Sequence, residues 1–107
     1  MKAILDKFTK HDTITIKLAS GEEVVASFQE ADDTSLSIDK PLALSPTPQG
    51  GVGLVPWIFS CKPGPTTINI NSVLALVGTD SEVADAYQQS TSNIIRPSSP
   101  DKQILTG

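Results

Sequence analysis

The stretch TITIKLASGEEVVASF (residues 13–28) decides the fold. Apolar residues alternate with polar ones on both sides of Gly21. The apolar residues that share one face are Ile14, Ile16, Leu18, Val24, Ala26 and Phe28. A period of two is typical of a half-buried strand, and a short turn between two such runs joins antiparallel partners. The stretch therefore predicts an antiparallel hairpin.

Further strand-like runs follow the hairpin. Residues 36–44 form one run, interrupted at Lys40-Pro41, and the turn-forming segment 45–51 comes after it. The apolar run Val52–Cys61 has hydrophobic residues on both faces and a kink at Pro56, which favours burial on both sides or contact with another chain. Two short runs, 66–70 and 73–77, complete the set. From among these runs we expect a small β-barrel of five strands over 13–78, joined by short turns.

Two short helices are expected to flank the barrel. Residues 2–9 place apolar side chains at helical spacing, and Thr79-Asp80-Ser81-Glu82 has the pattern of a capping box at the start of a helix over 80–91. Residues 92–107 are rich in serine and proline and are expected to be a flexible tail that folding does not require. The sequence thus predicts one domain over 1–91.

Composition limits the chemistry that this chain can perform. Of 107 residues 38% are hydrophobic, which suffices for one core, and the formal net charge of −4 is opposite to that of most nucleic-acid-binding domains. Cys61 and His11 are the only residues of their kinds, so we expect no metal site, no cofactor and no enzyme activity. The acids between residues 18 and 39 are interpreted as a solvated face rather than a cation site. Since no apolar run is long enough to span a membrane, we expect no membrane partner and a cytoplasmic protein.

The hairpin also carries a family resemblance. The pattern Ile14-x-Ile16-x-Leu18-x-x-Gly21-x-x-Val24-x-Ala26-x-Phe28, followed by Asp33-x-x-Leu36-Ser37, resembles the first motif of the Sm-like family, which includes the Sm and Lsm proteins and bacterial Hfq. Ala26 stands where that family has a glycine, and residues 68–73 stand in place of its second motif. The long segment 41–65 and the C-terminal helix resemble additions in phage-encoded members.

The resemblance implies an architecture and an assembly. It implies a five-stranded, strongly bent antiparallel barrel of the SH3-like kind, and a homo-oligomeric ring in which the fourth strand of one subunit pairs with the fifth strand of the next. The residues then expected at the subunit interface are Trp57, Ile58, Phe59, Val73 and Ala75.

The resemblance also implies a binding site for single-stranded RNA. By position, the pocket that holds a base in the family falls on Ser35, Ser37 and Asn69, with Asn71 beside it, and positive charge on one ring face comes from Lys2, Lys7 and Lys10. The serines and Asn69 replace the stacking, base-reading and charged groups of the family, so most of the pocket's binding energy is missing. Two functions remain open: an RNA-binding or RNA-chaperone ring, and a protein-interaction or scaffolding ring that has lost the RNA pocket. A monomeric OB-fold binder is the structural alternative.

Overall fold

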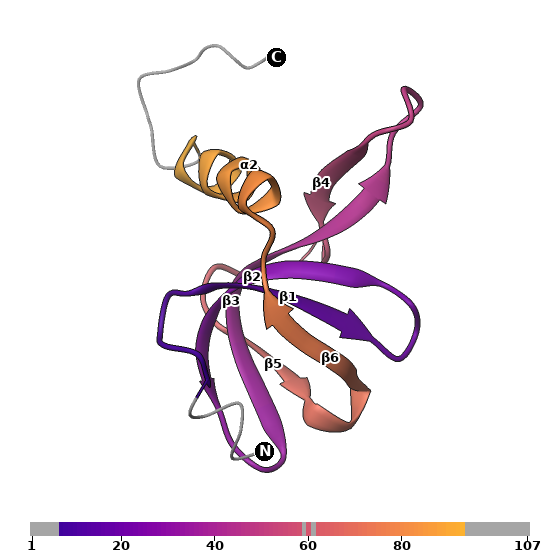
Figure 1. Cartoon of the computed structure of the whole chain (residues 1–107). Coiled ribbons are helices and arrows are strands. Elements are labelled where there is room, and N and C mark those ends of the chain that lie inside the picture. The colour runs from indigo at the N-terminus through magenta and orange to yellow at the C-terminus, as the bar shows by residue number, and fades with distance from the viewer. Residues whose placement is uncertain (1–6, 59, 61, 94–107) are drawn as a thin grey trace.

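The computed structural model describes residues 7–58, 60 and 62–93, which form an antiparallel sheet followed by a helix (Figure 1). The strands are β1 (Thr13–Leu18), β2 (Glu23–Ala31), β3 (Ser35–Pro46), β4 (Val52–Pro56), β5 (Thr66–Asn69) and β6 (Val73–Gly78). A 3-10 turn, Ile70–Ser72, joins β5 to β6, and helix α2 covers Ser81–Asn93. The mostly-β class expected from the sequence is confirmed.

The hairpin of β1 and β2 forms where the alternation predicts it. Ile16 pairs with Val24 in a regular antiparallel register. Gly21 has a φ of +102°, a conformation that glycine adopts without steric cost, and its N–H donates to the carbonyl oxygen of Leu18 at 2.9 Å.

One face of the sheet holds the main core. Its buried members are Ile14, Ile16, Leu18, Val24, Ala26, Phe28, Ala31, Leu36, Ile38, Ile68 and Ile70. All six apolar residues that the alternation assigns to one face of the hairpin are among them. Phe8 packs against this cluster, with its ring centroid 6.0 Å from that of Phe28.

Strand β3 continues through Lys40-Pro41, where the sequence predicts an interruption. Ser27 pairs with Asp39 but Val25 pairs with Leu42, so β3 contains one residue more than β2 between these pairs. Lys40 takes a φ of +49° at this bulge. A bulge leaves one residue out of the hydrogen-bond ladder, which is how a proline is accommodated inside a strand.

The far end of β3 projects from the sheet as a hairpin with β4 (Figure 1). Strand β4 ends at Pro56, so the strand expected over Val52–Cys61 is shorter than predicted. Val52 and Val55 are exposed rather than buried on both sides. Burial within this chain therefore does not account for these two valines of the run.

The sheet has six strands and is open, whereas the sequence predicts a closed barrel of five. The hydrogen-bonded order is β4-β3-β2-β1-β6, and β5 pairs with the first half of β3. The additional strand arises because β3 is long enough to pair with β5 along its first half and with β4 along its second. Among the described residues, β5 and β6 do not pair with each other.

Helix α2 begins after an N-cap one residue later than the sequence predicts. The Asp80 carboxylate accepts from the N–H of Glu82 at 3.1 Å and from that of Val83 at 3.4 Å, which is the role expected of an N-cap. Thr79, the expected cap, instead shares a hydrogen bond of 2.9 Å with the hydroxyl of Thr15. The helix extends to Asn93, two residues beyond the predicted end.

Tyr87 fixes α2 to the outer face of the sheet. Its side chain is only 2% exposed, and its hydroxyl lies 2.9 Å from the carbonyl oxygen of Lys40 and 3.2 Å from that of Asp39. Val25, on the face of β2 opposite the main core, is also fully buried. The bulge in β3 thus supplies the acceptors that hold the helix.

The buried phenol predicts a loss of stability in alkali. Burial, together with the charge of Asp39, raises the pKa of Tyr87 to about 12. Because ionisation is harder in the folded state, the free energy of unfolding should fall as the pH rises from 10 to 12, by about 2 kcal/mol in total. Tyr87→Phe should cost about 1 kcal/mol at neutral pH and remove most of this pH dependence. Urea unfolding at several pH values measures both effects, and an equally steep decline in the variant would contradict the prediction.

The N-terminal helix and the C-terminal tail expected from the sequence fall mostly outside the described residues. Of the helix predicted over 2–9, residues 2–6 are not described, Lys7 is helical, and Phe8 and Thr9 are not helical. The first two residues of the tail predicted over 92–107 belong to α2, and residues 94–107 are not described.

Candidate functional site

The turn between β2 and β3 is organised by the carboxylate of Asp32. One of its oxygens accepts from the N–H groups of Thr34 and Ser35, both at 2.8 Å. These hydrogen bonds hold the pKa of Asp32 below its usual value. The sequence motif points to Asp33 for the acidic position of this turn, whereas the structure gives the turn-closing role to its neighbour.

Ser35 and Ser37 lie together at one pocket beside this turn. In the ladder of β3 and β5, Ser35 pairs with Asn69 and Ser37 pairs with Thr67. The pocket, here called the serine pocket, has a volume of about 180 Å³ and is lined by Glu30, Ala31, Asp32, Ser35, Ser37 and Thr67. The structure therefore brings the two serines together, as the resemblance implies.

Asn69 and Asn71 lie next to the serine pocket but do not line it. The side-chain oxygen of Asn69 accepts from the N–H of Asn71 at 2.8 Å and so caps the 3-10 turn. The 3-10 turn is also tied to the turn between β2 and β3, because the N–H of Ile70 donates to the carbonyl oxygen of Thr34 at 3.0 Å. Asn69 is thus engaged in a local structural bond.

The charge around the serine pocket is negative. Glu30 and Asp32 are the charged residues among its lining, and the hydrogen bonds that lower the pKa of Asp32 favour the charged form of that carboxylate. Two carboxylates at the mouth of a small pocket repel the phosphate groups of a nucleic acid. The pocket is therefore better suited to a neutral or positively charged group.

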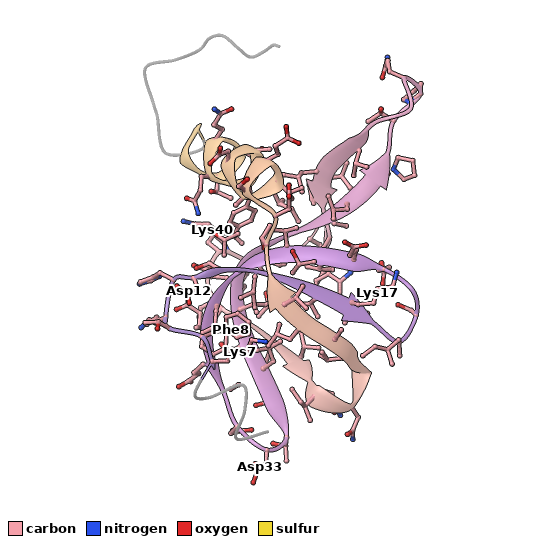
Figure 2. All side chains as sticks on the ribbon, in the orientation of Figure 1. Lys7, Phe8, Asp12, Lys17, Asp33 and Lys40 are labelled. Carbon is pink, nitrogen blue, oxygen red and sulfur yellow. The ribbon has the colours of Figure 1, made fainter. Side chains whose placement is uncertain are left out.

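The expected lysines do not compensate for this charge within the pocket. Lys2 lies outside the described residues, and neither Lys7 nor Lys10 lines the pocket. Lys7 is exposed, and its ammonium nitrogen lies 5.7 Å from the centroid of the Phe8 ring (Figure 2). Lys10 is also exposed, near the start of β1.

The residues expected at a subunit interface have different environments. Trp57 and Val73 are half-buried and pack against the main core. Ile58 is 41% exposed and Ala75 is exposed on β6. Phe59 lies outside the described residues.

Two exposed apolar residues of β6, Leu74 and Val77, were missed by sequence reasoning. They are 68% and 47% exposed, although β6 has the sequence VLALVG with no charged residue. The uncharged run is visible in the sequence. An apolar run of this kind indicates a buried strand unless its partner strands are known, so the sequence alone does not show that these residues are exposed. Among the described residues, β6 pairs with β1 alone and β5 with β3 alone.

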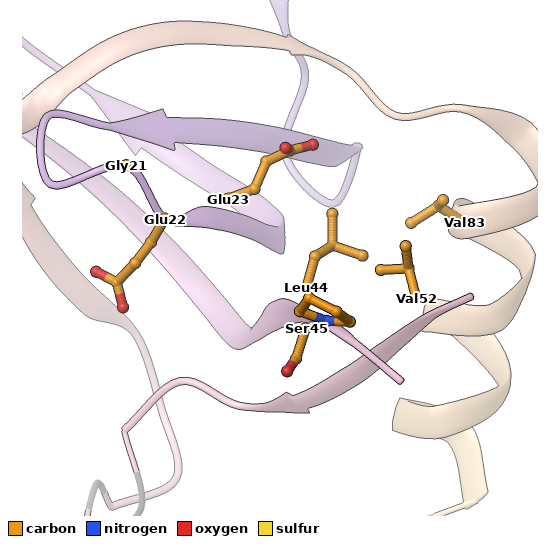
Figure 3. A pocket seen from close by; sticks show the side chains of 8 residues that line it. Gly21, Glu22, Glu23, Leu44, Ser45, Val52 and Val83 are labelled. Atoms are coloured by element: carbon orange, nitrogen blue, oxygen red, sulfur yellow. The ribbon is translucent and has the colours of Figure 1, made fainter. Parts of the chain in front are cut away.

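A larger groove lies on the side of the projecting hairpin. This hairpin groove has a volume of about 430 Å³ and is lined by Gly21, Glu22, Glu23, Leu44, Ser45, Pro46, Val52 and Val83 (Figure 3). It is bordered by the β1–β2 turn, the β3–β4 hairpin and the first turn of α2. Its position requires the helix and the hairpin together, so no sequence motif indicates it.

The described residues contain no cluster of His, Cys, Asp and Glu that could hold a metal ion. His11 has a φ of +80°, and its N–H donates to the carbonyl oxygen of Phe28 at 2.7 Å, so this residue shapes the turn before β1. None of the helices in the described part of the chain has the length and apolar character needed to span a bilayer.

Comparison with known proteins identifies no family for this chain. No protein-family model matches it, and a search of curated proteins finds no match. The chain is therefore defined by its own fold, an open antiparallel sheet with a C-terminal helix, and by the pockets and edges described above.

Proposed function

We propose that this chain is a homo-oligomeric protein-interaction or scaffolding module that assembles head to tail, with β5 of one copy beside β6 of the next. Repeating one such contact between two different edges closes into a ring when the rotation per copy allows it. The resemblance of the first hairpin to the Sm-like family supports this arrangement, because ring assembly through the last two strands is what that resemblance implies.

The observation that carries the proposal is the open, uncharged edge of β6. Exposed strand edges usually carry lysine, proline or a covering element that prevents pairing with another chain. Strand β6 has no charged residue or proline, and Leu74 and Val77 are left exposed. An edge of this composition is stabilised by a second strand, and β5 offers a free edge at the other end of the order β5-β3-β2-β1-β6.

The charges favour a protein partner for the assembled module over a nucleic acid. The net charge of −4 is multiplied by the number of subunits in an oligomer, and the serine pocket adds Glu30 and Asp32 at the position where RNA binding would be expected. Both features raise the electrostatic cost of bringing a polyanion to the surface.

Cysteine cross-linking tests the head-to-tail contact. We replace Cys61, the only cysteine, by serine, and then prepare one chain with Thr67→Cys on β5 and another with Ala75→Cys on β6. Both sites are exposed, and facing positions on paired strands lie within disulfide range. Mild oxidation of the mixture should give a disulfide-linked heterodimer as the main product.

The matched control replaces Ala75→Cys by Gln89→Cys on the exposed face of α2. An equally high yield of disulfide-linked heterodimer with this control would contradict β5–β6 pairing between copies. Homodimers of each chain as the main products would also contradict it.

RNA binding is a second candidate, favoured by the meeting of Ser35 and Ser37 at one pocket beside Asn69. If the pocket holds a base, Ser37→Asn should strengthen binding to a uridine-rich RNA about tenfold, since the amide adds a donor and an acceptor. Fluorescence anisotropy with uridine-rich and adenine-rich RNAs at low salt measures this, and Ser27→Asn, outside the pocket, is the control. A lack of binding by both the natural chain and the variant would exclude this candidate.

A further inference from the structure

The hairpin groove combines an apolar floor with an acidic rim. Leu44, Val52 and Val83 converge in it from β3, β4 and α2 (Figure 3). Val52 is 66% exposed, a large fraction for a valine next to two other aliphatic side chains. The charged residues of the lining are Glu22 and Glu23, from the β1–β2 turn. The groove is therefore suited to an aliphatic side chain accompanied by a positive charge.

We propose that this groove binds the chain's own segment Lys102-Gln103-Ile104-Leu105. In this arrangement Ile104 and Leu105 cover Val52 and its aliphatic neighbours, and the ammonium group of Lys102 lies at the acidic rim. Among the described residues, none from β5 or β6 lines the groove, so the site is separate from the proposed assembly edges.

Chain length selects this segment over the other apolar pair after α2. Val83 and Asn93 are ten residues apart in the helix, which corresponds to about 15 Å at a rise of about 1.5 Å per residue. Ile94 and Ile95 follow Asn93 directly, so they lie at most about 7 Å from it, which is too short to return to Val83. Leu105 is twelve residues beyond Asn93 and reaches up to about 40 Å, which is ample.

The charges of groove and segment are complementary. The segment 102–105 carries one positive charge and two aliphatic residues, and the groove offers two carboxylates and an aliphatic floor. Covering an exposed aliphatic floor by aliphatic side chains is favourable in proportion to the apolar area removed from water. The docked segment would compete for the groove with other protein segments of the same chemistry.

Methyl NMR of the full chain tests the proposal. We compare the natural chain with a double variant, Ile104→Asp and Leu105→Asp, and with a matched control, Ile94→Asp and Ile95→Asp. The methyl signals of Leu44, Val52 and Val83 should shift by more than their linewidth in the first variant and stay in place in the control. Signals of Leu36 and Ile38, in the main core, should not move in either.

Two further measurements distinguish docking of the segment within its own chain from docking between copies and from indirect effects of the substitutions. A peptide of residues 94–107 added to the Ile104→Asp, Leu105→Asp chain should restore the natural signals of the groove.

The same difference between variants should persist in chains whose assembly edge is removed by Leu74→Asp and Val77→Asp, because the segment belongs to the same chain. Identical groove signals in the natural chain and the Ile104→Asp, Leu105→Asp variant would overturn the proposal, and so would loss of the difference in chains without the assembly edge.

Discussion

Replacing Leu74 and Val77 together by aspartate is expected to convert the assembled protein into monomers. Both side chains lie exposed on β6, the uncharged edge that we propose pairs with a neighbouring copy. Two carboxylates without partners would then be buried in each contact, at a cost of several kcal/mol per contact. Size-exclusion chromatography with light scattering should show the loss of the oligomer at micromolar concentration.

The matched control for this variant is Val55→Asp. Val55 is nearly as exposed as Val77, at 40% against 47%, but it lies on β4 and not on the proposed edge. It should leave both the oligomer and the circular dichroism spectrum unchanged, because exposed substitutions away from contacts have small effects. Dissociation by both variants, or by neither, would contradict the assignment of the interface to β6.

Leu36→Ala is expected to have the largest effect on the stability of the single chain. Leu36 is fully buried in the main core, and it lies in β3 between the two serines of the serine pocket. Truncation of such a leucine leaves a cavity and should lower the free energy of unfolding by about 2–5 kcal/mol. The loss should also disorder the pocket, because Leu36 pairs with Ile68 of β5.

Urea unfolding followed by circular dichroism measures this effect. The variant is best made in the Leu74→Asp, Val77→Asp chain, so that subunit dissociation does not contribute to the measured stability. Val55→Ala, at an exposed position of β4, serves as the control and should change the stability by less than about 0.5 kcal/mol. A similar loss from both substitutions would show that the core does not lie where the structure places it.

Local sequence predicts the parts of this fold that depend on local pattern. The β1–β2 hairpin follows from a period of two around Gly21, and α2 follows from a capping signal within one residue of the observed N-cap, Asp80. Lys40-Pro41 shows the limit of this reasoning. A proline has no N–H to donate at a regular position of the hydrogen-bond ladder. Whether the strand then ends or forms a bulge depends on the partner strand, and the local sequence does not specify that partner.

The same limit applies to the candidate sites. The motif singles out Ser35 and Ser37, which share one pocket, because they follow the hairpin at a fixed spacing on β3. Leu74 and Val77 were missed because exposure of an apolar strand depends on which edges remain unpaired. The hairpin groove was missed because Leu44 and Val83 are far apart in the sequence and meet only through the packing of α2.

Native mass spectrometry of the full chain most directly tests whether this protein assembles into a closed oligomer through its strand edges. We expect a single species whose mass is a fixed multiple of the 11.3 kDa chain, unchanged over a tenfold range of micromolar concentration. A closed ring requires one subunit number, because each copy uses both of its edges. A monomer, or a continuous series of sizes that grows with concentration, would contradict assembly into a closed ring.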